Sequence, residues 1–129
     1  MSINITIPVE PVAKARARVC VRNGRAFAYT PSKTAQAERD IQKFLKGYPI
    51  YPAGVPLAMS VTFYMTRPKS AKKRLYPPGD VDNYGKLAMD AVQGKLYQND
   101  SQVVMLSVGK DYGNPARIEI EIQEINETV

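Results

Sequence analysis

The sequence contains no histidine among its 129 residues. This absence excludes Ser-His-Asp and Cys-His catalytic arrangements, histidine metal ligands and acid–base chemistry by imidazole. Any metal ion would therefore have to be bound through oxygen atoms, which are the ligands that hard cations such as Mg²⁺ and Mn²⁺ prefer.

Cysteine and long apolar runs are also scarce. The single Cys20 cannot form an intrachain disulfide, and no N-terminal apolar run resembles a signal peptide, so we expect a reducing, cytoplasmic setting. No stretch of about 18 apolar residues occurs, so we expect no membrane span. We expect residues 1–129 to form one domain, since a chain of this length can bury roughly two-thirds of the surface that it exposes when unfolded.

The positive charge is concentrated in the first part of the chain. Residues 1–79 carry fourteen Lys and Arg against three acids, whereas residues 80–129 carry four against nine, within a net charge of +6. A basic surface beside an acidic cluster suits a polyanionic substrate that one part of the protein holds and the other processes. The alternative is a basic surface that is solvated and has no such role.

The periodicity of apolar residues predicts an α/β (α+β) fold, a mixed β-sheet packed with two helices. Alternating patterns predict four strands, of which the second is central and the last two are antiparallel, at residues 2–9, 57–66, 103–108 and 117–122. Helical spacing predicts one helix from Thr30 or Ser32 to about Lys46 and another over residues 83–93, ending near Gly94. Residues 48–56 contain three prolines and are expected to be irregular.

Two basic segments flank this framework. Residues 16–22 and 25–29 are predicted to form a hairpin around Asn23-Gly24, a pair that favours a type I′ turn, and to present arginines to solvent or phosphate. Residues 67–74 form a loop in which five of eight residues are basic. The candidate phosphate-binding residues are Lys14, Arg16, Arg18, Arg22, Arg25, Arg67, Lys69, Lys72, Lys73 and Arg74.

An acidic cluster follows the basic loop directly. Asp80 and Asp82 are two residues apart, so an extended backbone there would place both carboxylates on one side, and Asp100 could join them from a separate loop. Convergent carboxylates are costly unless a divalent cation joins them, and such cations polarise a phosphodiester and activate the attacking water. We therefore predict a phosphodiester-cleaving metal site with Asp80, Asp82 and Asp100 as ligands. Lys86 could return over the first helical turn, either to neutralise charge developing on the phosphate or to restrain the carboxylates.

Two other interpretations of these acids are open to test. Asp82 or Asn83 could be the N-cap of the following helix, and Asp90 on or beside that helix could be structural. An EF-hand loop also begins Asp-x-Asp, but Tyr84 occupies a ligand position there and Ala91 stands where the bidentate Glu belongs. The composition therefore excludes an EF-hand calcium site.

The acidic motif resembles that of a known family. It reads Asp80-Val81-Asp82-Asn83-x-x-Lys86-x-x-x-Asp90-Ala91-Val92, followed by Asn99-Asp100-Ser101-Gln102-Val103. These strings are similar to the RusA family of Holliday junction resolvases, and residues 11–30, with Lys14-Ala15-Arg16, look like the N-terminal region of its prophage-type members. Asn99 departs from the Asp that members often carry, and Tyr84 and Gly85 stand where more apolar or helix-favouring residues are frequent.

The resemblance implies a RusA-like homodimer, bacterial or phage-encoded, that uses Mg²⁺ to make paired symmetric nicks in four-way DNA junctions during DNA recombination and repair. By position in the motif, Asp80, Asp82 and Asp100 would bind the metal and Lys86 would be the catalytic lysine. The basic residues named above would then contact DNA. Two alternatives are a catalytically inactive, structure-selective DNA-binding module and a nuclease of other branched DNA.

Overall fold

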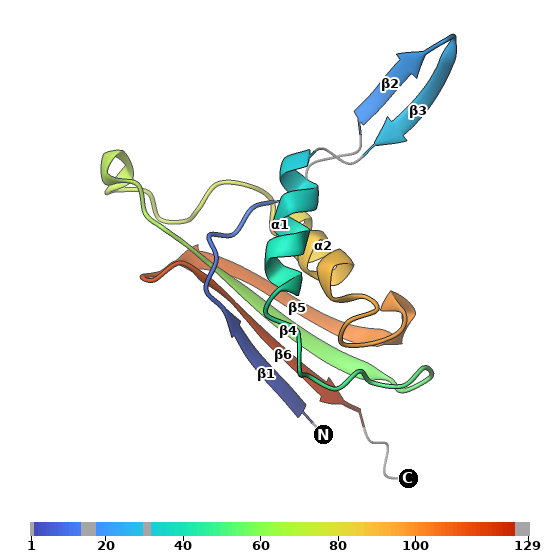
Figure 1. Ribbon diagram of the computed structural model, residues 1–129. Coiled ribbons are helices and arrows are strands. Elements are labelled where there is room, and N and C mark those ends of the chain that lie inside the picture. The colour runs from blue at the N-terminus through green and yellow to red at the C-terminus, as the bar shows by residue number, and fades with distance from the viewer. Residues whose placement is uncertain (1, 14–17, 30–31, 126–129) are drawn as a thin grey trace.

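The computed structural model describes residues 2–13, 18–29 and 32–125. Four strands form one mixed sheet, and two helices, α1 (Ser32–Gln42) and α2 (Val81–Val92), cover one of its faces (Figure 1). The strands lie in the order β1 (Ser2–Ile7), β6 (Arg117–Glu124), β4 (Leu57–Met65) and β5 (Val103–Tyr112). This arrangement confirms the predicted α+β fold.

Strand β4 is central, as its strongly apolar pattern predicted. It pairs antiparallel with β6 on one side and parallel with β5 on the other. Two parallel neighbours need a crossover connection, and α2 lies on this crossover between β4 and β5. Strands β5 and β6 run antiparallel, as expected, but they do not pair, because β4 lies between them.

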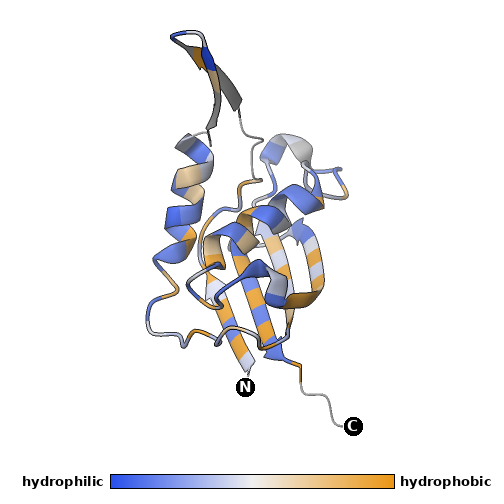
Figure 2. Cartoon of the chain, turned by 90° about the vertical axis from the view of Figure 1, so that its right-hand side faces the viewer, coloured by the Kyte–Doolittle hydropathy of each residue, from blue (hydrophilic) through white to orange (hydrophobic). Residues whose placement is uncertain are grey.

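The core lies between the helices and the inner face of the sheet. Along the strands, apolar and polar residues alternate, and the stripes of hydropathy are visible in Figure 2. Leu87, Ala88, Ala91 and Val92 of α2 are buried against this face, as their spacing predicted. Strand β5 departs from the pattern: Val104, Met105 and Leu106 are 59%, 65% and 45% exposed, because β5 is an edge strand with an irregular register at its start.

Both helices differ from the prediction at one end. α1 ends at Gln42, before the predicted Lys46, because Phe44 and Leu45 donate to the carbonyls of Ile41 and Gln42 in tighter turns. Its predicted cap at Thr30 lies outside the described residues, and Ser32 is already helical. α2 begins at Val81, two residues before the predicted start, and ends before Gly94, whose φ is 78°.

The predicted basic hairpin is present as a separate two-stranded sheet of β2 (Arg18–Arg22) and β3 (Arg25–Tyr29), which extends away from the rest of the chain (Figure 1). Asn23 and Gly24 at its turn have φ values of 52° and 74°, as a type I′ turn requires. Within the described part of the chain, no helix is long and apolar enough to cross a membrane.

Candidate active site

The first two acids of the motif lie at the start of α2. Asp80 is the N-cap residue and has an extended backbone, whereas Asp82 is already in the first helical turn. The backbone is therefore not extended throughout residues 80–82, the condition for placing both carboxylates on one side, since the helix begins one residue after Asp80. The capping interpretation is wrong: the N-cap is neither Asp82 nor Asn83, and Oδ1 of Asp82 accepts the N–H of adjacent Asn83 at 3.0 Å. Both carboxylates are exposed at the positive end of the helix dipole.

The turn that precedes Asp80 is held by two side chains from other parts of the chain. The hydroxyl of Tyr84 donates to the carbonyl of Pro78 at 3.0 Å. Nζ of Lys110, on β5, donates to the carbonyl of Pro77 at 2.7 Å and also to that of Gly79. The sequence offered no signal for Lys110, because only the parallel pairing of β4 and β5 brings it beside this turn.

Tyr84 and Gly85, which depart from the family pattern, pack α2 against the sheet. The ring of Tyr84 is buried, 5.3 Å from that of Phe63 between centroids. A Cβ at Gly85 would lie 3.0 Å from Cγ2 of Val108. The missing side chain therefore lets α2 approach β5 closely, and Lys86, the next residue, is exposed on the outer side of the helix.

Lys86 lies between two acids on the surface of α2. It follows Asp82 by four residues and precedes Asp90 by four, so the three side chains form one stripe along the helix. Its Nζ lies 3.9 Å from Oδ1 of Asp90. Lys86 thus contacts the acid on the following turn, whereas the sequence allows it to return over the first turn toward Asp80 and Asp82.

Asp100 begins a short 3₁₀ helix, η2 (Asp100–Gln102), whose backbone is well anchored. Asn99 and Gln102 form a capping box, which explains how Asn can replace Asp at position 99. The N–H of Asp100 donates to Oε1 of Gln93 at 3.0 Å.

The carboxylate of Asp100 is bonded to a buried tyrosine. The hydroxyl of Tyr97 donates to its Oδ1 at 2.7 Å, and the ring of Tyr97 is fully buried. Burial, the hydrogen bond with Asp100 and the charges of Asp100 and Asp90 raise the pKa of Tyr97 far above its usual value. The hydroxyl therefore remains protonated and donates at any pH near neutral.

These residues fit a hard cation by their chemistry, since the candidate ligands are all carboxylates. Their positions fit less well. Among the residues described, no three or more His, Cys, Asp or Glu side chains are grouped so that they could hold a metal ion. The hydroxyl that binds Asp100 is also 3.5 Å from the carbonyl of Met89, which is about 10 Å along the helix axis from Asp82. Asp100 therefore lies beside the third turn of α2, and the three-ligand site stays a prediction.

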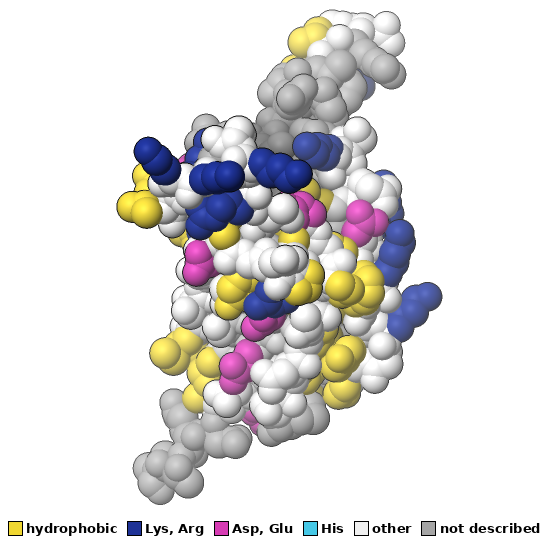
Figure 3. All heavy atoms as spheres, turned by 90° about the vertical axis from the view of Figure 1, so that its left-hand side faces the viewer, with side chains coloured by type: hydrophobic (Ala, Val, Ile, Leu, Met, Phe, Trp, Pro, Cys, Tyr) yellow, Lys and Arg dark blue, Asp and Glu magenta, His cyan; other side chains and the backbone are white. Residues whose placement is uncertain are grey.

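The basic loop lies on the surface. It includes a 3₁₀ turn, η1 (Lys69–Ala71), and its five basic side chains are exposed. Figure 3 shows one face of the molecule, with Lys and Arg side chains gathered on its upper part and acidic side chains below them. Arg67 stacks over the ring of Tyr112, 4.1 Å from its centroid. In the hairpin, Arg25 is exposed and Arg18 and Arg22 belong to β2, whereas Lys14 and Arg16 lie outside the described residues.

Comparison with known proteins agrees with the motif. The family model for Endodeoxyribonuclease RusA matches residues 8–123 of this chain. The chain is also 34% identical to a Bacillus subtilis (strain 168) protein, "Uncharacterized protein YqaN", in an alignment that covers 96% of this chain and 97% of that protein. The chain therefore belongs to the RusA family of endodeoxyribonucleases, as its acidic motif predicted.

Proposed function

We propose that this chain is a Mg²⁺-dependent endodeoxyribonuclease that resolves four-way DNA junctions by paired symmetric nicks, in DNA recombination and repair in the bacterial cytoplasm. The observation that carries the proposal is the position of the motif residues: Asp80, Asp82 and Lys86 lie in the first part of α2, and Asp100 lies beside its third turn. Family membership over residues 8–123 supports the same chemistry.

Asp80, Asp82 and Asp100 would hold Mg²⁺, or Mn²⁺ in its place. A bound ion of this kind polarises the phosphodiester and lowers the pKa of the attacking water. Asp80 and Asp82 are exposed and Asp100 is half-buried, so rotation of the first two side chains changes the separation of the carboxylates without disturbing the core. In this proposal, that rotation brings the first two carboxylates toward the more firmly held Asp100.

Lys86 would stabilise the negative charge that develops on the scissile phosphate. Its ion pair with Asp90 is long, at 3.9 Å, and the lysine side chain is 68% exposed. Exposed pairs of this kind contribute only about 0–1 kcal/mol, so a phosphate can replace Asp90 as the partner at little cost. The ammonium is thus kept near the acids and stays able to move.

The basic loop and the hairpin would bind the phosphate backbone of the junction. Five exposed cations in one loop supply the charge, and phosphate contacts of this kind make affinity fall steeply as salt rises. A flat salt dependence of junction binding would count against DNA as the ligand.

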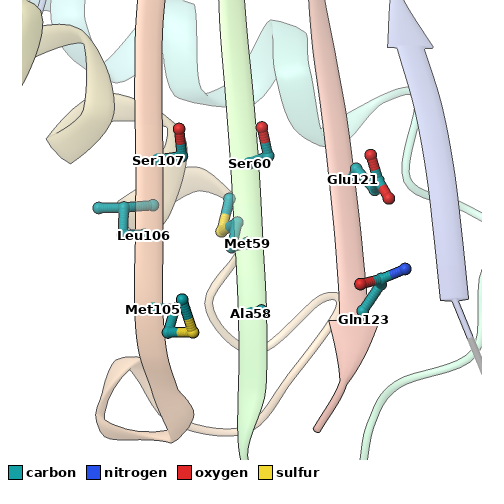
Figure 4. Close-up of a pocket in the computed structure, with 8 residues that line it drawn as sticks. All are labelled: Ala58, Met59, Ser60, Met105, Leu106, Ser107, Glu121 and Gln123. Atoms are coloured by element: carbon teal, nitrogen blue, oxygen red, sulfur yellow. The ribbon is translucent and has the colours of Figure 1, made fainter.

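A homodimer would supply two active sites for two opposed strands. Its support is the edge strand β5, where Val104, Met105 and Leu106 are exposed, because an exposed apolar edge can pair with a second chain. Met105 and Leu106 also line a hollow across β4, β5 and β6, shown in Figure 4. Light scattering should find a dimer for the wild type and a monomer for Met105→Lys; a wild-type monomer would contradict the dimer.

The central test is Asp82→Asn with a synthetic four-way junction. We expect Mg²⁺-dependent cleavage to fall by about 100- to 1,000-fold, while junction binding without Mg²⁺ and the free energy of unfolding stay near the wild-type values. Asp111→Asn is the matched control, because Asp111 is an exposed acid on β5 outside the motif, and it should cleave normally. Cleavage retained by Asp82→Asn would rule out the proposed enzyme.

The separation of Asp100 from Asp80 and Asp82 favours a second candidate, a junction-binding module without catalysis. Gel shifts with and without Mg²⁺, combined with the cleavage assay, distinguish the two: the module binds junctions and cleaves nothing. Competition between a four-way junction, a flap and a linear duplex then identifies the preferred substrate, including the case of a nuclease of other branched DNA.

A further inference from the structure

We infer that Tyr97 is a positioning residue, which orients the carboxylate of Asp100 for binding a divalent cation. The inference rests on the proposed function, in which Asp100 is a metal ligand, and it adds a residue that the acidic motif does not contain. It is carried by a single contact, the 2.7 Å hydrogen bond from the Tyr97 hydroxyl to Oδ1 of Asp100.

Tyr97 itself is held firmly by burial in the core and by its backbone contacts. Tyr97 is 0% exposed, its carbonyl accepts the N–H of Gly94 at 2.7 Å, and its backbone forms isolated bridges with Tyr51 and Gln93. The hydroxyl is therefore a donor at a set position.

Asp100 is anchored through its backbone. Gln93 accepts its N–H, and the capping box of Asn99 and Gln102 encloses the turn. With the backbone anchored, the bond to Tyr97 restricts rotation of the carboxylate about its last torsion. One oxygen of this partly exposed group is thus bonded to the phenol. In this inference the other oxygen binds the cation. Ligating carboxylates are commonly hydrogen-bonded by such outer partners.

A phenylalanine would fill the same buried space, so the hydroxyl can be tested separately from the ring. We expect Tyr97→Phe to weaken Mg²⁺ binding to the DNA-free protein by about 10-fold in isothermal titration calorimetry, the lower end of the range for outer partners of metal ligands. The matched control is Tyr51→Phe. Tyr51 is also buried, at 1% exposure, but its hydroxyl donates to the backbone carbonyl of Ile122. It should bind Mg²⁺ within about twofold of the wild type, since this hydroxyl bonds to a backbone carbonyl away from Asp100.

Kinetics provide a second measurement that packing alone would not change. In Tyr97→Phe, the Mg²⁺ concentration for half-maximal nicking should rise by the same factor of about 10, while the rate at saturating Mg²⁺ stays close to that of the wild type. Gln93→Met, at an exposed position, removes the acceptor of the Asp100 N–H and should weaken Mg²⁺ binding in the same direction. This variant keeps the inference testable if Tyr97→Phe does not fold.

Three outcomes would overturn the inference. Equal Mg²⁺ affinity in Tyr97→Phe and Tyr51→Phe would mean that the hydrogen bond from Tyr97 to Asp100 does not affect cation binding. Tighter binding in Tyr97→Phe would mean that Tyr97 holds Asp100 away from the cation, and unchanged binding in Gln93→Met would mean that the orientation of Asp100 is unimportant. Asp100→Asn separates this inference from the proposed function: wild-type Mg²⁺ affinity in that variant would remove the proposed metal site itself, whatever Tyr97 does.

Discussion

At the start of α2, hydrogen bonds hold the backbone that leads to Asp80, whereas beside its third turn a hydrogen bond holds the carboxylate of Asp100 itself. Tyr84 and Lys110 bind the carbonyls of residues 77–79, and the carboxylates of Asp80 and Asp82 remain exposed. Tyr97, from the core, binds Oδ1 of Asp100. At one end of the candidate site the backbone is held by hydrogen bonds, and at the other end the acidic side chain itself is held.

The difference has a physical origin in the two segments. Pro77 and Pro78 have no N–H and so cannot donate to neighbouring carbonyls, and their own carbonyls accept from side chains of α2 and β5. Around Asp100, the polar residues Gln93, Asn99 and Gln102 satisfy the backbone locally, which leaves the Tyr97 hydroxyl available for the carboxylate. We therefore expect Asp100 to be preorganised, and Asp80 and Asp82 to adjust when a cation or DNA binds.

After the acids themselves, the largest effect is expected at Lys86, which lies between the two ends. Lys86→Met should lower the rate of junction nicking by about 100-fold, because the phosphate loses its nearby cation. The free energy of unfolding should change by less than about 0.5 kcal/mol, since the pair with Asp90 is exposed. Nicking assays and urea unfolding measure the two quantities. Lys86→Arg should recover part of the rate, and an unchanged rate in Lys86→Met would exclude Lys86 from the chemistry.

A smaller effect is expected when the turn before Asp80 is distorted. Gly79 has a φ of 92°, and an added Cβ would lie 3.0 Å from the ring of Tyr84. Gly79→Ala should lower the free energy of unfolding by about 2–3 kcal/mol, from the sum of backbone strain and overpacking. Gly54→Ala is the matched control, because its φ is 86° and nothing lies within 4 Å of the added Cβ. It should lose only about 1 kcal/mol.

Urea unfolding measures this pair of variants, and Mg²⁺ affinity should fall in Gly79→Ala alone. Equal losses of stability in the two variants would show that the contact between Gly79 and Tyr84 does not constrain the turn.

The smallest effect is expected at Lys110. Lys110→Met removes the bonds to Pro77 and Gly79 and should lower the free energy of unfolding by about 1 kcal/mol, because the freed carbonyls can be solvated at this partly exposed position. Nicking should slow by a few fold as the turn before Asp80 loosens. Lys95→Met, which removes an exposed lysine near the far end of α2, should leave both quantities unchanged. A Lys110→Met variant that matches Lys95→Met would mean that Tyr84 alone holds the turn.

Much of the fold followed from patterns within single segments. Alternation marked β1, β4 and β6, helical spacing marked the buried face of α2, and Asn23-Gly24 marked the hairpin turn. The acidic motif identified the family and its four candidate residues. Such features are predictable because burial on one face of an element, or a positive φ at a turn, requires particular residue types at fixed spacing.

Contacts between segments could not be predicted in this way. The parallel pairing of β4 with β5 brings Lys110 to the turn before Asp80, and the loop after α2 brings Asp100 to the Tyr97 hydroxyl. The exposure of Val104, Met105 and Leu106 likewise depends on which strand forms the edge of the sheet. Local spacing therefore identified the candidate acids of the site. Their separation and their hydrogen-bond partners depend on long-range packing, because side chains distant in the sequence meet only when the sheet forms around β4.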